Sequence, residues 1–186
     1  MKREDCILFS GGAPGAEAEF GAHAERYGID EVNFTFEGHN IARQRGLRVL
    51  THEELLAGDV SLAYVSRLMN RRYTESPALR RILQTIWYQV NSGQEIYVVG
   101  HIEDDKTVRG GTGWGAEFAK LCNKPLAVFD QVRNGWFAWT GADWEPRAAD
   151  RVAIAHPHVT GTGTRVLAEN GREAIAGLFR RSFGHA

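Results

Sequence analysis

The residues CILFSGGAPGAEAEFGAHAERYG (6–28) join a short apolar run to a helical pattern through a glycine-rich turn. Apolar side chains then recur at the spacing of one helix face, at Ala16, Phe20, Ala24 and Tyr27. Gly28 follows as a natural stop. The stretch therefore predicts a β-strand, a tight turn and an α-helix, which is the repeating unit of α/β proteins.

The same alternation continues along the chain. Strands are expected at EVNFTFEGH (31–39), Leu47–Leu50, Ile96–Gly100 and PLAVFDQ (125–131), with helices from Thr51, Pro77, Trp114 and Arg172 onward. Thr51 and Glu54 fit a capping box, and Asp59 is expected to cap a second helix after Gly58. The turns in NGWFAWTGADWEP (134–146) predict a small hairpin or edge strand.

These elements predict an α/β fold with a Rossmann-like, mainly parallel sheet flanked by helices, in a single domain over residues 1–186. A small hairpin or edge strand is expected toward the C-terminus. In such sheets, ligands bind outside the carboxyl ends of the strands, at the point where the strand order reverses.

Composition narrows the class of protein. The formal net charge of −1 and the lack of a basic stripe disfavour nucleic acid as a partner. No apolar run approaches the ~20 residues of a membrane span, and a cytoplasmic location is expected. The two cysteines and the His156/His158 pair lack metal-ligand spacing, so neither a metal nor another cofactor is predicted.

Two glycine-rich turns are candidates for anion binding, because each precedes a helix whose first N–H groups and positive dipole end attract negative charge. In the first, Ser10, Gly11, Gly12 and Gly15 are the expected ligand-binding residues. In the second, they are Arg109, Gly110, Gly111, Thr112, Gly113 and Trp114. The alternative for both is a turn that only reverses the chain.

Glu117 is expected in the first turn of the helix that follows the second glycine-rich turn. One interpretation is a favourable interaction with the helix dipole. The other places it in the crevice, as a general base or as an acceptor for a ribose hydroxyl.

Five more positions follow predicted strands or occupy a polar turn. Glu37 and His39 come after the second strand, His101 comes after the strand at 96–100, and Thr164 and Arg165 lie in the turn GTGTR (161–165). Each is a candidate ligand contact at the carboxyl end of the sheet, with a solvated loop as the alternative.

Several of these residues resemble motifs of known families. RGGTGWGAE (109–117) is similar to the PGGxGTxxE signature of LONELY GUY-type proteins, with Arg109 in place of the proline and Trp114 in place of the threonine. SGGAPGA (10–16) resembles the first loop of the wider SLOG superfamily, which includes DNA-processing protein A and proteins described as molybdenum-cofactor carriers. Together with VFDQ (128–131), Trp136 and GTGTR, the chain resembles an uncharacterised branch of that superfamily that contains GGTGW.

The resemblance implies a nucleotide or related ribose phosphate as ligand, and a homodimer as one assembly. Binding without turnover, as a sensor or carrier, is the first hypothesis. The alternative is a nucleoside 5′-monophosphate N-glycosidase, in which Glu117 acts with an arginine that precedes it. Arg81 is assigned that role, and Arg80 and Arg109 remain alternatives.

Overall fold

Eight strands form one sheet in the computed structural model, which describes residues 1–73 and 76–185. The strand order is β3–β2–β1–β8–β4–β5–β6–β7. Neighbouring strands from β3 to β5 run parallel, whereas β6 and β7 are antiparallel. The α/β fold and its mainly parallel sheet are confirmed, and the predicted hairpin is the β6–β7 edge.

The strands are β1 (Ile7–Ser10), β2 (Asp30–Thr35), β3 (Leu47–Val49), β4 (Glu95–Gly100), β5 (Leu126–Asp130), β6 (Gly135–Trp139), β7 (Trp144–Arg147) and β8 (His158–Gly163). The α-helices are α1 (Ala16–Arg26), α2 (His52–Leu56), α3 (Asp59–Leu68), α4 (Pro77–Ser92), α5 (Thr112–Leu121) and α6 (Glu169–Phe183). Short 3-10 turns lie at Arg3–Asp5 and Ala149–Arg151.

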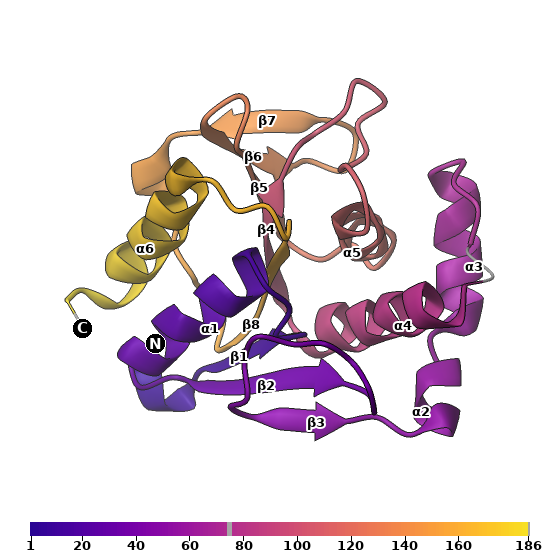
Figure 1. Cartoon of the computed structure of the whole chain (residues 1–186). Coiled ribbons are helices and arrows are strands. Elements are labelled where there is room, and N and C mark those ends of the chain that lie inside the picture. The colour runs from indigo at the N-terminus through magenta and orange to yellow at the C-terminus, as the bar shows by residue number, and fades with distance from the viewer. Residues whose placement is uncertain (74–75, 186) are drawn as a thin grey trace.

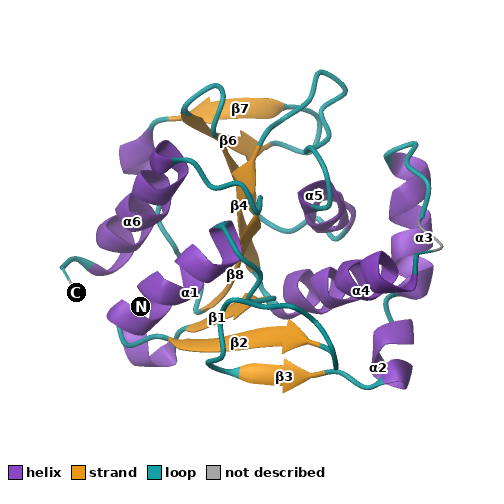
Figure 2. Ribbon diagram, in the orientation of Figure 1, coloured by secondary structure: helices purple, strands orange, loops and turns teal. Residues whose placement is uncertain are grey.

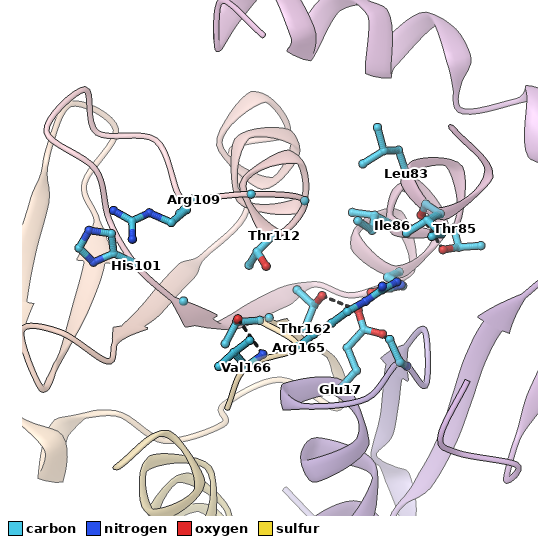
Figure 3. Close-up of a pocket in the computed structure, with 18 of the residues that line it drawn as sticks. Glu17, Leu83, Thr85, Ile86, His101, Arg109, Thr112, Thr162, Arg165 and Val166 are labelled. Carbon is cyan, nitrogen blue, oxygen red and sulfur yellow. Dashed lines mark hydrogen bonds between the residues drawn. The ribbon is translucent and has the colours of Figure 1, made fainter. Parts of the chain in front are cut away.

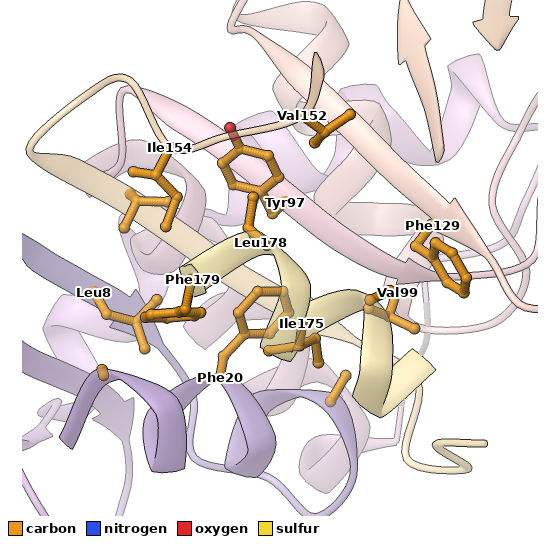
Figure 4. Packing of buried hydrophobic residues seen from close by; sticks show 14 of the residues in the cluster. Leu8, Phe20, Tyr97, Val99, Phe129, Val152, Ile154, Ile175, Leu178 and Phe179 are labelled. Atoms are coloured by element: carbon orange, nitrogen blue, oxygen red, sulfur yellow. The ribbon is translucent and has the colours of Figure 1, made fainter. Parts of the chain in front are cut away.

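Helices cover the sheet on two sides, as Figures 1 and 2 show: α1 and α6 on one side, and α2 to α5 on the other. The core under α1 and α6 gathers aromatic and aliphatic side chains, among them Phe20, Ile175 and Phe179 (Figure 4). The opposite core lies between the sheet and helices α3, α4 and α5. No helix in the described ranges has the length and apolar character needed to cross a bilayer.

Local signals set several helix ends. Thr51 and Glu54 form the predicted capping box at α2. Helix α3 begins where expected, but Gly58 is its N-cap, and Asp59 instead accepts hydrogen bonds from Tyr73, Gln84 and Arg80.

Helix α5 begins at Thr112, two residues before the predicted Trp114. Gly113 permits this early start, because a Cβ there would lie 2.0 Å from the carbonyl oxygen of Val108. The shift moves Glu117 from the first helical turn into the second.

The order of the strands creates a switch point. From β1 the chain proceeds outward to β2 and β3, whereas from β4 it proceeds the other way to β5, and β8 lies between the two halves. The carboxyl ends of β1, β8 and β4 therefore meet at one place in the sheet, where ligands of this fold class bind.

Candidate functional site

A cavity of about 600 Å³ lies at this switch point. Its floor comes from the segments after β1, β4, β5 and β8, and Figure 3 shows α4 and the start of α5 beside it. Helix α4 lines one wall with Leu79, Ile82, Leu83 and Ile86. The volume falls within the range of roughly 300–1,000 Å³ that small-molecule sites occupy.

The first glycine-rich turn mainly packs against β8 and the segment that follows it, and contributes little to the cavity lining. Ser10 is buried, and its hydroxyl donates a 2.7 Å hydrogen bond to the carbonyl of Gly161, which ties β1 to β8. Gly15 has φ +92°, and a Cβ there would lie 2.4 Å from the carbonyl oxygen of Thr164. Ala13 is the residue of this turn that lines the cavity, whereas Ser10, Gly11, Gly12 and Gly15 do not.

Glu17 occupies the position at the start of α1 where an anion was expected. Its Oε2 accepts a 3.0 Å hydrogen bond from the N–H of Ala13, and its Oε1 accepts a 2.8 Å bond from the Thr162 hydroxyl. Burial raises the pKa of Glu17, although these two donors and the charge of Arg165 oppose that effect. The protein thus places its own carboxylate at this helix end.

The second glycine-rich turn remains open to the cavity. Gly110, Gly111 and Thr112 line it, and a Cβ at either glycine would meet nothing within 4 Å. The N–H groups of Gly111 and Thr112 have no hydrogen-bond partner within residues 1–73 and 76–185. Unpaired amides at a helix start form a ready anion site. The start of α5 can therefore bind an anion from the ligand, whereas the start of α1 already holds the Glu17 carboxyl group.

Trp114 belongs to the core. It is 6% exposed, packs against Tyr73 with ring centroids 5.6 Å apart, and borders a smaller pocket that adjoins the main cavity at Gly110 and Gly111. Trp114 and Gly113 are both absent from the lining of the 600 Å³ cavity.

Glu117 also lies outside the cavity. Thr112 and Glu117 are five residues apart, which is about 140° around the helix axis, so the two side chains leave different faces of α5. The Glu117 Oε2 is 3.1 Å from the Lys120 Nζ, and that ammonium lies 4.1 Å from the centre of the Trp139 ring.

The arginines occupy different environments. Arg80 pairs with Asp59. Arg81 lies over the Phe36 ring and, with Glu37, lines a second pocket near α2 rather than the main cavity.

Two arginines line the main cavity. Arg109 does so while donating hydrogen bonds of 2.5 and 3.1 Å to Glu103. Arg165 is exposed, and its guanidinium has no hydrogen bond or ion pair to any residue that the structure describes. Figure 3 shows its side chain extending across the cavity toward Glu17. Arg165 is therefore the arginine that a bound anion could engage without breaking an existing ion pair.

His39 presents a ring nitrogen without a partner. Its Nδ1 lies 3.1 Å from the Thr35 hydroxyl, and its ring stacks on Phe36 with centroids 4.6 Å apart. Its Nε2 is buried and unpaired among the described residues. Burial, together with the positive charge of Arg165, lowers the pKa of His39 and favours the neutral ring.

His101 is positioned by a buried carboxylate. Its Nδ1 lies 3.4 Å from the Oδ1 of Asp130. That oxygen also accepts hydrogen bonds from the N–H groups of Val132 and Arg133, and the Oδ2 accepts one from the N–H of Ile102. Burial would raise the pKa of Asp130, but these N–H groups and the His101 ring outweigh burial and hold it below its ordinary value. The carboxylate therefore stays ionised and fixes the imidazole at the cavity wall.

The cavity brings together about half of the residues predicted from sequence. Those that line it are His39, His101, Arg109, Gly110, Gly111, Thr112, Thr164 and Arg165. Sequence reasoning missed Glu17, Gln89 and the apolar wall of α4 as site residues. Glu17 had a signal, an acid directly after a glycine-rich turn, whereas the α4 pattern is the same for a core face and a ligand wall.

A solved structure shares this fold. It is described as "Putative molybdenum carrier protein" from Syntrophus aciditrophicus SB, with a TM-score of 0.56 and 15% sequence identity over 96% of this chain and 94% of that one. No protein-family model matches the sequence. A search of curated proteins also gives no match.

Proposed function

We propose that this protein binds a phosphorylated small molecule, a nucleotide or a related ribose phosphate, as a sensor or carrier. The observation that carries the proposal is that Gly111 and Thr112 at the start of α5, whose amides have no partner among the described residues, line the same cavity as Arg165, whose guanidinium also has no such partner. Helix N–H groups and arginine are the donors that phosphate groups prefer.

The charges that line the cavity indicate where the phosphate of the ligand lies. The ionised form of Glu17 would repel a phosphate from the first glycine-rich turn. The second turn carries no such carboxylate, and the Thr112 hydroxyl points from α5 into the cavity (Figure 3). The phosphate is therefore expected near Thr112 and Arg165.

An apolar part of the ligand would lie on α4. Leu79, Ile82, Leu83 and Ile86 line the cavity from α4, and Figure 3 shows Leu83 and Ile86 on the side away from His101. A flat heterocycle placed against it would remove apolar surface from water, which contributes roughly 25 cal/mol per Å² buried. A nucleotide supplies both the anion and the ring.

A carrier or sensor is favoured over a hydrolase on the position of Glu117. The N-glycosidase hypothesis used this glutamate as its base, and a general base must lie within hydrogen-bond reach of the proton it removes. Glu117 pairs with Lys120 and does not line the cavity. The name of the structurally similar protein also describes a carrier.

A thermal-shift series tests the proposal, with AMP, ADP, ADP-ribose and ribose 5-phosphate as ligands and adenosine as the unphosphorylated control. A ligand at 100 times its Kd stabilises the folded state by about 2.7 kcal/mol. At least one phosphorylated compound is expected to raise the Tm more than adenosine does. If none of them shifts the melting curve, the proposed function is wrong.

Turnover is tested separately. Each compound that binds is incubated with the protein and the mixture is separated by chromatography. A sensor or carrier leaves the nucleotide intact. Release of free base would instead support the hydrolase hypothesis with a base other than the predicted one.

A further inference from the structure

The cavity lining includes a buried side-chain amide. Gln89 projects from α4, is 1% exposed and lines the cavity. Its Oε1 is enclosed and has no hydrogen-bond partner within residues 1–73 and 76–185. The group of this amide that a ligand can reach is therefore the Nε2, a donor for which a hydroxyl oxygen is a suitable acceptor.

Gln89 and Glu17 are neighbours in this lining. Gly11 brings them together, because a Cβ on that residue would lie 2.4 Å from the Gln89 Nε2 and 2.8 Å from the Glu17 Oε2. The missing side chain thus makes room for both polar groups. Gly11 serves the site indirectly, although it does not line the cavity itself.

Glu17 retains acceptor capacity after its internal bonds are counted. Each of its oxygens accepts one hydrogen bond, from Ala13 and from Thr162, whereas an ionised carboxylate offers about four acceptor positions. Burial, the largest effect, raises the pKa of Glu17, whereas both internal donors and the nearby charge of Arg165 favour its ionised form. The Glu17 carboxyl group beside the Gln89 amide nitrogen suits neighbouring hydroxyl groups, which both donate and accept hydrogen bonds, and not a second anion.

We propose that Glu17 and Gln89 bind the vicinal hydroxyl groups of a ribose, whose phosphate is held by Arg165 and the start of α5. The proposal rests on the proposed function and assigns the sugar to a defined place in the same cavity. A ribose offers two adjacent hydroxyl donors, and within a pentose phosphate these lie close to the phosphate.

Arg165 favours hydroxyl groups over the edge of a base. Its side chain extends toward Glu17, and its charge acts on that carboxylate. A group that contacts Arg165 and a group that contacts Glu17 must therefore be near each other on the ligand. Phosphate and hydroxyls on one sugar ring meet that requirement, whereas a base edge lies beyond the sugar.

Calorimetric titration with ribose 5-phosphate and 2-deoxyribose 5-phosphate tests the proposal on the wild-type protein. The deoxy sugar lacks one donor, and its Kd is expected to be about tenfold higher, the effect of one lost hydrogen bond. AMP against 2′-deoxy-AMP and 3′-deoxy-AMP repeats the comparison with a base attached. Each deoxy nucleotide is expected to bind about tenfold more weakly than AMP.

Two variants test whether Glu17 and Gln89 cause the preference for ribose over deoxyribose. Gln89→Leu keeps a similar volume and removes the amide, and Glu17→Gln removes the charge. Each is expected to weaken ribose 5-phosphate binding about tenfold, and the variant at the residue that binds the 2-hydroxyl should leave the 2-deoxy sugar nearly unaffected. Glu25→Gln is the matched control, because Glu25 is on the same helix with a side chain that is 59% exposed. It is expected to retain the wild-type preference.

The outcomes separate the two proposals. If no phosphorylated sugar or nucleotide binds, the proposed function fails and the sugar site fails with it. If ribose and deoxyribose forms bind equally well, the proposed function stands and the sugar site is refuted. If a folded Gln89→Leu protein keeps the wild-type preference for AMP over both 2′-deoxy-AMP and 3′-deoxy-AMP, Gln89 does not bind either hydroxyl group. If a variant does not fold, the wild-type comparison of the two sugars decides.

Discussion

Replacing Arg165 with alanine is expected to damage ligand binding while leaving the fold as stable as before. The side chain is exposed and makes no hydrogen bond or ion pair to a described residue, so its removal breaks no internal contact of that kind. Surface substitutions of this type change the free energy of unfolding by about 0.5 kcal/mol or less. For a chain of this size, that corresponds to a Tm change of about 1–2 °C.

The expected loss in binding is larger. A hydrogen bond to a charged group contributes about 1.5–3 kcal/mol. Since each 1.4 kcal/mol is a factor of ten, Arg165→Ala should raise the Kd for ribose 5-phosphate or AMP about 10- to 150-fold. The expectation lies toward the upper part of that range, because a ligand has no ion pair between Arg165 and a described residue to break first.

Calorimetry measures the Kd, and a thermal melt of the free protein measures stability. Arg151→Ala is the control, because Arg151 is also exposed but does not line the cavity. That variant should bind like the wild type. An Arg165→Ala protein that melts normally and binds phosphate compounds with unchanged affinity would refute the assignment of Arg165 as the anion contact.

Three further predictions follow from the geometry. Glu117→Gln should leave the Kd for AMP within about twofold, because Glu117 does not line the cavity and its carboxylate pairs with Lys120 on another face of α5; a large loss in the titration would contradict this. The pKa of Glu17 is raised in the folded state, so as pH rises from the ordinary Glu value of 4.5 through that pKa the folded protein must ionise a buried group. The free energy of unfolding should therefore fall over this pH range, and urea unfolding of Glu17→Gln should show a weaker pH dependence. Gly161→Ala should lower the free energy of unfolding by about 1–3 kcal/mol, since its Cβ would lie 2.5 Å from the buried Phe20 ring; an unchanged urea midpoint would show that the ring can move aside.

The local elements of this fold were predictable because their signals are local. The strand–turn–helix at the N-terminus, the capping box at Thr51 and the hairpin after Asn134 each depend on a few neighbouring residues. Helix α5 was misplaced by two residues, because its start depends on Gly113 packing against Val108, a contact that no propensity encodes. That small error moved Glu117 to the wrong part of its helix.

Several candidate site residues that follow strands line the cavity, whereas residues on helices that line it were not predicted. His101 and Arg165 line the cavity because parallel strands bring their carboxyl ends to one edge. Gln89 and Leu83 could not be recognised, since on a helix the same spacing serves a core face and a ligand wall.

By itself, the sequence determined the α/β class, the mainly parallel sheet and the presence of two glycine-rich turns before helices. These follow from hydrophobic periodicity and backbone chemistry, which act over short distances along the chain. Tertiary structure alone decided that the two turns differ, with Glu17 at the start of α1 and open amides at the start of α5. The reason is that Glu17 is held by Thr162, a residue far away in sequence that reaches it only because β8 lies between β1 and β4.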